Sequence, residues 1–484
     1  MLYLIIGENM KKVLRIFLLL IMVFTLSACT EKDERPELKL VTEAGFAPFE
    51  YYENDKIVGV DIDIAKEIAK ELDYKLVVKD VAFDSIISEV KTGKSDIGAA
   101  GISYTKERAK EVDFSRDYIK SKQIVVVKKD SDIEKLEDIK GSIAVQLGTV
   151  ADLHLTENYP NVKLVREKKF MAAIEDLKGN KVDAVAMDEI PAKQLMTSDM
   201  KILEKPLVVD SFGIVVKKGN KKLLDATNKV IDRLNEAGKI DDFVLKHMDI
   251  EPKKEKNGIM NKIHNTLVKD KRYNYILEGL KNTILIALGA VIIGLIIGTF
   301  MGIVRNYHES TSKLKILNFL SKTYVTIIRG TPSILQLMII YYVIFKKTSV
   351  NIVLVGIIAF GINSSAYIAE IIRAGINSVS KHQVEAGEAL GLPYGKIMRY
   401  IVMPQAIKNI LPALGNEFIT LVKETAVGAY IGIVELTKAS DIIASRTYDY
   451  FFPLIVIALI YLVITYSLSY LVGLMEKRLN NVRS

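Results

Sequence analysis

The sequence predicts two domains in series: a two-lobed α/β domain, and after it an all-α membrane domain with five spans. Short apolar segments alternate with amphipathic ones up to about Ile250, which is typical of α/β folds. From about Tyr275 onward the chain holds apolar runs of about 20 residues, the length at which a helix crosses a bilayer. The composition agrees, because 484 residues with 50% hydrophobic and 26% charged side chains suit a soluble part joined to a membrane part.

Residues 1–28 have the pattern of a secretory signal peptide. Basic residues precede the apolar run Ile16–Leu26, and small residues follow it. Cys29 is the only cysteine in the chain, so it has no partner for an internal disulfide. The segment Leu26-Ser27-Ala28-Cys29 resembles the lipobox of bacterial lipoproteins, which implies that Cys29 carries a lipid anchor and that residues 29–37 form a tether. The alternative, an uncleaved signal anchor, places the next domain on the same side of the membrane.

Residues 38–250 are predicted to form the α/β domain, with mainly parallel strand pairing. Amphipathic helices are expected at Asp61–Leu72 and Ser85–Lys91. Two similar apolar segments, at 123–129 and 213–218, bracket an inner block of the chain. If both cross between lobes, the block is a second lobe, the pair is a hinge, and the cleft between the lobes is the ligand site. Strands are expected at Leu38–Thr42, Asp96–Ala100, Ile124–Val127, Ser142–Val145, Asp183–Met187 and Phe212–Val216.

Several segments of this domain carry a family pattern. They are 46–50 (FAPFE), 59–63 (GVDID), 99–108 (AAGISYTKER), 112–115 (VDFS) and 182–188 (VDAVAMD). Together they resemble the periplasmic-type binding proteins for polar amino acids, over essentially all of Leu38–Met248. The resemblance implies an extracytoplasmic domain whose two lobes close on an amino acid.

The resemblance also implies roles for single residues. Arg108, three residues after a threonine, would hold the α-carboxylate, because an arginine fork donates two parallel charge-assisted hydrogen bonds. Asp188 would hold the α-ammonium group, and Glu43 would contact the ligand side chain. A carboxylate there favours a basic or amide side chain, so we expect arginine, lysine, histidine or glutamine as the ligand. Further contacts are expected from Phe46, Phe83, Gly101, Ser103 and Thr149.

Each of these assignments has a structural alternative. Arg108 would otherwise be a surface residue at the start of a helix, and Asp188 would only cap the helix that follows it. Phe46 and Phe83 would otherwise be ordinary core residues.

Residues 251–274 are predicted to be a linker, and residues 275–484 the membrane domain. The five expected spans are 280–304, 324–346, 350–372, 410–436 and 453–475. Basic residues gather after the first span, after the third and in the tail, and the positive-inside rule places these segments in the cytoplasm. The chain is therefore expected in the cell membrane, with a cytoplasmic C-terminus and the α/β domain outside.

A polar segment at 384–414 lies between the third and fourth spans. Its first part, from Glu385 to Gly391 (EAGEALG), has small residues for close docking and a glycine suited to end a helix in a left-handed cap. The segment resembles the EAA loop by which permease subunits of ABC importers contact their ATPase. Glu385, Ala386 and Gly391 are therefore expected to couple the chain to an ATP-binding partner.

All of Tyr275–Ser484 resembles the permeases of polar amino acid ABC importers. Together the two halves imply a receptor and a permease in one chain, which would form a homodimer and bind two ATPase subunits. No Gly-x-x-x-x-Gly-Lys-[Ser/Thr] motif occurs, so we expect the partner to use the ATP. This chain is expected to be a transport subunit rather than an enzyme, to bind an amino acid and the lipid bilayer, and to bind no cofactor, metal or nucleic acid.

Charged residues in or near a span are usually functional or paired. The candidates here are Glu370, Arg373, Lys423 and Glu424. Glu370 and Arg373 are at helical spacing, so they either pair with each other or act directly.

Two other classes of protein use a similar two-lobed domain. Ligand-gated channels of the glutamate-receptor type insert a pore between the lobes, whereas these lobes are continuous and no Thr-Val-Gly-Tyr-Gly-like filter occurs. A membrane-tethered dehydratase would need a cluster of catalytic acids and bases, and none stands out among the five histidines. A dehydratase also has no use for an EAA-like loop.

Overall fold

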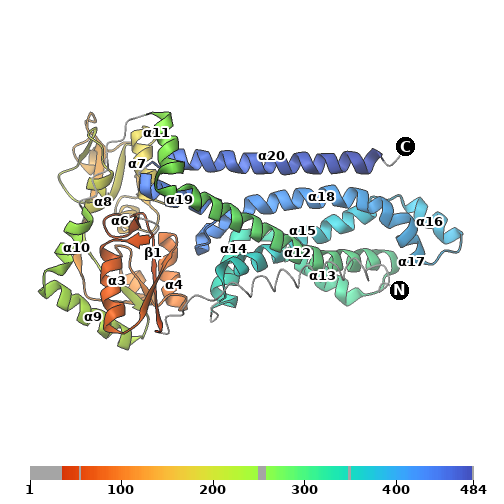
Figure 1. Ribbon diagram of the computed structural model, residues 1–484, viewed down its shortest axis with the longest axis horizontal. Coiled ribbons are helices and arrows are strands. Elements are labelled where there is room, and N and C mark those ends of the chain that lie inside the picture. Colours follow the sequence, from red (N-terminus) through yellow and green to blue (C-terminus); the bar gives the residue numbers. More distant parts are fainter. Residues whose placement is uncertain (1–34, 54–55, 249–257, 347–349, 448, 482–484) are drawn as a thin grey trace.

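The computed structural model describes residues 35–53, 56–248, 258–346, 350–447 and 449–481, in two domains that lie end to end (Figure 1). An α/β domain occupies one end, and long helices extend from it to the other. The expected signal peptide and Cys29 lie outside the described residues.

The first lobe of the α/β domain is built on a five-stranded sheet in the order β4-β1-β5-β13-β6. Strand β1 (Glu37–Thr42) is parallel to its two neighbours, β4 (Lys75–Asp80) and β5 (Ile97–Gly98). By contrast, β13 (Val215–Lys217) is antiparallel to both β5 and β6 (Val112–Phe114). The helices of this lobe are α3 (Val60–Glu71), α4 (Ile86–Thr92), α5 (Lys106–Glu111), α9 (Lys221–Glu236) and α10 (Lys239–Met248), and a small hairpin joins β2 (Tyr51–Glu53) to β3 (Lys56–Val58).

The second lobe has a sheet in the order β11-β7-β10-β8-β9, with β12 paired to β7. Parallel pairs join β8 (Ser142–Gln146) to β9 (Lys163–Glu167) and to β10 (Ala184–Asp188). The long strand β7 (Ile119–Lys128) is antiparallel to β10, to β11 (Met200–Ile202) and to β12 (Val208–Phe212). The helices of this lobe are α6 (Val150–Asn158), α7 (Phe170–Lys178) and α8 (Glu189–Leu195).

The expected hinge is displaced by a few residues. Segments 123–129 and 213–218 do not form the crossing pair, because the first lies in the sheet of the second lobe and the second in that of the first lobe. The lobes are instead joined where β7 and β12 pair, from Gln123↔Val208 to Ile119↔Phe212. Each sheet is also mixed rather than mainly parallel, because the returning strands β7 and β13 run antiparallel to their neighbours.

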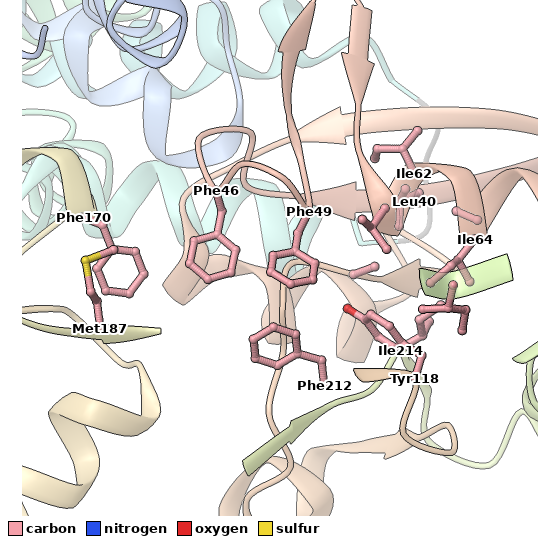
Figure 2. Packing of buried hydrophobic residues seen from close by; sticks show 14 of the residues in the cluster. Leu40, Phe46, Phe49, Ile62, Ile64, Tyr118, Phe170, Met187, Phe212 and Ile214 are labelled. Carbon is pink, nitrogen blue, oxygen red and sulfur yellow. The ribbon is translucent and has the colours of Figure 1, made fainter. Parts of the chain in front are cut away.

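A hydrophobic core spans both lobes and reaches the cleft between them (Figure 2). Phe46 and Phe49 of the first lobe pack with Phe212, which ends β12. Phe46 also stacks on Phe170 of the second lobe, with ring centroids 5.5 Å apart. This aromatic contact holds the lobes close together in the structure.

The membrane domain consists of long helices packed side by side. The glycines of α12 allow α15 to approach closely, because a Cβ at Gly298 would lie 2.6 Å from the carbonyl oxygen of Ser365, and one at Gly302 would lie 2.8 Å from that of Ala369. The helices are α12 (Tyr273–Thr311), α13 (Lys315–Gly330), α14 (Ser333–Ile339), α15 (Ile352–Asn377), α16 (Lys381–Ala389), α17 (Tyr394–Ile397), α18 (Met403–Glu424), α19 (Leu436–Thr447) and α20 (Phe451–Asn481).

Three helices within the described residues are long and apolar enough to span a membrane: α12, α15 and α20. A fourth is reached only if α13 and the segment Ser333–Ile344 form one broken span, since they meet at 107°. The five-span count is therefore not confirmed. The expected span 324–346 crosses this bend, which falls at Thr331-Pro332, where the proline restricts the residue before it to an extended conformation.

The other unconfirmed span is 410–436. Its residues form the second part of α18, which ends at Glu424, and then a 3₁₀ segment η7 (Thr425–Ile431). Asn416, Glu417, Lys423 and Glu424 make this helix less apolar than the other long ones.

The segment between the domains is partly helical. Residues 258–271, which fall in the expected linker, include α11 (Ile259–Ile263) and two short helical turns before α12 begins. At the far end of the membrane domain, α16 and α17 lie opposite to the α/β domain (Figure 1).

Candidate functional site

A pocket lies in the cleft between the two lobes, with about 310 Å³ of empty space when the open solvent at its mouth is included. It includes residues from both, so its shape depends on how the lobes close. All eight residues expected to bind a ligand line it: Glu43, Phe46, Phe83, Gly101, Ser103, Arg108, Thr149 and Asp188. The pocket is also lined by Glu50, Ala100, Gln123, Gln146, Val150 and Phe170.

Arg108 supplies the positive charge of the pocket. Its Nη1 donates to the carbonyl oxygen of Ser103 at 2.7 Å, and its Nη2 donates to that of Gly148, in the other lobe, at 2.9 Å. The guanidinium also lies over the ring of Phe83, at 5.5 Å from the centroid. Burial lowers the pKa of Arg108 to about 10, against the opposing effect of Asp210 and Asp188, so the group is charged at neutral pH. The side chain of Arg108 is half-buried and turned toward the pocket.

Asp188 supplies a buried carboxylate at the end of β10. Its Oδ1 accepts hydrogen bonds from Ser121 Oγ at 2.7 Å and from Gln123 Nε2 at 2.6 Å. Asp188 stands at the first position before α8, but its side chain makes no capping hydrogen bond. Burial and the nearby carboxylate of Asp210 raise the pKa of Asp188 to about 8. A cationic group bound beside it would stabilise the ionised form.

Glu43 lies in the same pocket and is paired across the cleft. Its Oε1 is 2.9 Å from Nζ of Lys169, in the second lobe. Its Oε2 accepts from Gln146 Nε2 at 3.3 Å. The carboxylate that the sequence places at the ligand side chain is therefore already paired within the chain.

The backbone around the pocket is shaped by Gly101 and Thr149. Gly101 has a φ of +53°, and a Cβ there would lie 2.6 Å from the ring of Phe46. Its N–H donates to Asp61 Oδ2 at 3.0 Å. Thr149 caps α6, and its hydroxyl donates to the carbonyl oxygen of Gln146 at 2.8 Å, so this hydroxyl is already engaged. Ser103 Oγ donates to Asp210 Oδ2 at 2.6 Å.

Sequence reasoning missed Gln123, Gln146, Lys169 and Asp210. Gln123 Nε2 contacts both Asp188 and Asp210, and its Oε1 has no hydrogen-bond partner among the described residues. Gln123, Gln146 and Asp210 come from strands that meet only in the folded sheet, and Lys169 immediately precedes α7, so no local motif marks them. Asp210 had one signal, since it is a carboxylate within the apolar strand that returns to the first lobe.

The α/β domain also contacts the membrane domain through paired side chains. Asp80 Oδ2 lies 2.8 Å from Nζ of Lys438 in α19, and Lys168 Nζ lies 4.1 Å from the ring centroid of Tyr430. Lys79 donates to the hydroxyl of Tyr341. Asp80 also accepts from the N–H of Ala44, the residue next to Glu43, at 3.1 Å. Both lobes therefore contact the membrane domain.

The expected coupling segment forms a short exposed helix. Glu385 and Ala386 are exposed on α16, whereas Gly387 is buried against Ile397. Gly391 has a φ of +72°, and the N–H of Leu392 donates to the carbonyl oxygen of Gly387 at 3.1 Å, which is the geometry of a left-handed helix cap. A Cβ at Gly391 would meet no atom of this chain within 4 Å.

The charged residues of the membrane domain fall into two groups. Glu370 Oε2 is 2.8 Å from Arg305 Nη1, and its Oε1 accepts from Arg373 Nε at 3.1 Å, so this carboxylate is paired twice. Lys423 is exposed and Glu424 half-buried at the end of α18. Within the described residues, no group of three or more His, Cys, Asp or Glu side chains has the arrangement of a metal site.

Comparison with known proteins gives a match for each domain. Residues 38–250 match the bacterial extracellular solute-binding proteins, family 3, and residues 292–481 match the binding-protein-dependent transport system inner membrane component.

Single relatives cover the membrane half. The putative glutamine transport system permease protein GlnP of Rickettsia bellii (strain RML369-C) is 42% identical over 209 residues, which are 42% of this chain and 93% of the relative. The arginine transport system permease protein ArtQ of Bacillus subtilis (strain 168) is 39% identical over 209 residues, 43% of this chain and 93% of the relative.

A solved structure described as the substrate binding protein of an amino acid ABC transporter is 41% identical, with a TM-score of 0.41, and the match covers 44% of this chain and 98% of that one.

Proposed function

This chain belongs to the polar amino acid ABC importers, as a solute-binding domain fused to a permease domain, and we propose that it captures a polar amino acid and passes it through its own membrane domain. It is a multi-pass membrane protein and a transport subunit. The family implies an ATP-binding partner, and in our proposal that partner hydrolyses the ATP in a separate chain.

The pairing of charges in the interlobe pocket carries this proposal. Arg108 offers a guanidinium to a carboxylate, and Asp188 offers a carboxylate to an ammonium group, in one pocket lined by both lobes. A free α-amino acid has both groups on one carbon, so it would bind both side chains at once. A ligand that bridges the lobes would also favour their closed arrangement, because it contacts both lobes at once only when the cleft is shut.

Glutamine and arginine are the ligands that we favour. The relatives named for glutamine and arginine support this choice, and so does the carboxylate of Glu43, which accepts hydrogen bonds from an amide or a guanidinium.

We further propose that the chain has five spans and that α18 is one of them, although its charged residues lower its hydropathy. Ser364 Oγ of α15 donates to Glu417 Oε1 of α18 at 2.7 Å, which is how polar groups inside a membrane domain are usually satisfied. The binding domain then lies outside and α16 in the cytoplasm, as the basic flanking residues favour. Two copies of this chain would pair with two ATPase subunits, and Cys29 would carry a lipid anchor.

The channel and dehydratase alternatives have no support from these relatives, which are transport permeases. A channel would conduct without ATP, which gives the deciding experiment.

The test is reconstitution of the full chain in vesicles with an ATP-binding subunit. We expect uptake of labelled glutamine or arginine that requires ATP on the side where α16 lies. Uptake by the chain with no ATPase present, or ligand-gated ion flux without amino-acid uptake, would overturn the proposal.

A further inference from the structure

Lys169 and Glu43 form an ion pair between the two lobes at the ligand pocket. Glu43 follows β1 in the first lobe, and Lys169 immediately precedes α7 in the second. Their charged atoms are 2.9 Å apart, and the side chains are only 5% and 10% exposed. A lysine and a carboxylate are rarely buried to this degree unless they are paired.

The residues around Lys169 hold its ammonium group in place but do not use all of its N–H donors. Gly45 leaves room for it, since a Cβ there would lie 3.4 Å from Nζ. Gln146, which lines the pocket, contacts Glu43 and also donates to the carbonyl oxygen of Lys168 at 3.0 Å. Among the described residues, the carboxylate of Glu43 is the one partner of Lys169 Nζ within ion-pair distance. Lys169 therefore has N–H groups to offer to an acceptor on a ligand.

Lys169 keeps its charge in this position. Burial by itself lowers the pKa of Lys169, but the carboxylate of Glu43 opposes that effect. Two further carboxylates, Asp441 of α19 and Asp80, act in the same direction and leave the pKa raised. Burial also raises the pKa of Glu43, while Lys169 acts to lower it, so the two groups stabilise each other's charge in this buried position.

We propose that Lys169 determines ligand specificity: by neutralising Glu43, it makes the pocket select an uncharged carboxamide side chain, as in glutamine, over a guanidinium or ammonium. This inference rests on the proposed amino-acid binding. A carboxamide both donates and accepts, so it would donate to the Glu43 carboxylate and accept from Lys169. A cationic side chain would meet the same carboxylate with a second cation beside it, and like charges held close together in a buried site oppose binding.

The experiment uses the full chain in lipid nanodiscs and calorimetric titration with L-glutamine and with L-arginine. Lys169→Met removes the charge and keeps a long apolar side chain. Lys178→Met is the matched control, because Lys178 ends α7, the helix that Lys169 precedes, and is paired with Glu175 outside the pocket. If Lys169→Met does not fold, the double variant Glu43→Gln/Lys169→Met removes both buried charges and Lys169→Arg retains the cation.

We expect the parent chain and Lys178→Met to bind glutamine more tightly than arginine. In Lys169→Met the ratio of the two affinities should move toward arginine by roughly tenfold or more. Lys169→Arg should keep the glutamine preference, and the double variant should lose the gain in arginine affinity, because the unpaired carboxylate is gone. A ratio that stays within about threefold of the parent value in Lys169→Met, or a parent chain that prefers arginine, overturns the inference. A folded parent chain that binds neither amino acid contradicts the proposed function instead.

Discussion

Asp80 of the binding domain and Lys438 of α19 form an ion pair across the junction of the two domains, 2.8 Å apart and only 6% and 3% exposed. The same Asp80 accepts a hydrogen bond from the N–H of Ala44, next to the pocket residue Glu43. A short path of direct contacts therefore joins the ligand pocket to the membrane domain.

Lys438→Met should uncouple the two domains. Removing one partner of a buried ion pair leaves an uncompensated charge and costs about 3–5 kcal/mol. We expect a lower melting temperature of the full chain and weaker stimulation of ATP hydrolysis by the amino acid, with ligand affinity little changed. Lys229→Met is the control, since Lys229 is exposed and pairs with Glu71 on the lobe surface. Normal stimulation of the ATPase in Lys438→Met would show that this pair does not transmit ligand binding.

Arg108→Ala should abolish amino-acid binding while the binding domain stays folded. Loss of one partner of a buried charge pair costs roughly 2–5 kcal/mol, which is on the order of 30- to several-thousand-fold in affinity. The variant also removes the hydrogen bond to Gly148 that joins the lobes. Calorimetric titration of the full chain measures the effect, and Arg116→Ala, which breaks only a surface pair with Asp232, should bind normally. Affinity within about threefold of the parent value would remove Arg108 from the site.

Amino-acid affinity should rise with pH between about 6 and 8. Asp188 has a raised pKa of about 8 in the empty pocket, so below that pH it is mostly protonated. The α-ammonium group of the ligand stabilises the ionised form, and binding must then release a proton. The affinity should increase by up to about tenfold per pH unit and level off near the pKa.

Titration in buffers of different ionisation enthalpy measures the released proton directly. Asp188→Asn should bind more weakly, release no proton from this site and lose the pH dependence. An affinity that is flat from pH 6 to 8 in the parent chain would mean that Asp188 does not contact the ammonium group.

Gly391→Val should block transport and leave ligand binding intact. A β-branched residue is strained at the φ of +72° that ends α16, and its side chain would project from the exposed surface expected to meet the ATPase. Vesicle uptake and amino-acid-stimulated ATP hydrolysis should both fall steeply.

Gly219→Val provides the matched control for that variant. Gly219 has a φ of +82° and, like Gly391, open space around its Cβ, but it lies in the binding domain. Equal loss of transport in both variants would assign the effect to backbone strain, and normal uptake in Gly391→Val would contradict the coupling role of α16.

Much of the fold was predictable because its signals are local. The helix expected at Asp61–Leu72 is α3 at Val60–Glu71, and the strand expected at Leu38–Thr42 is β1 at Glu37–Thr42. The crossing between lobes was misplaced because several similar apolar segments follow one another, and only long-range pairing shows that β7 and β12 join the lobes. The bend between α13 and α14 was missed because the apolar residues on both sides of Pro332 were assigned to a single span.

The sequence by itself determined the order of the two domains, the pocket residues that stand in family motifs, and the left-handed cap at Gly391, because each depends on residues close together in the chain. Only the tertiary structure decided how the charges pair. Glu43 meets Lys169, Asp188 meets Gln123, and Asp80 meets Lys438, all over long sequence separations. Electrostatic interactions act through space and strengthen with burial, so the charge of this pocket follows from the packing of the lobes and not from the carboxylates that the chain displays.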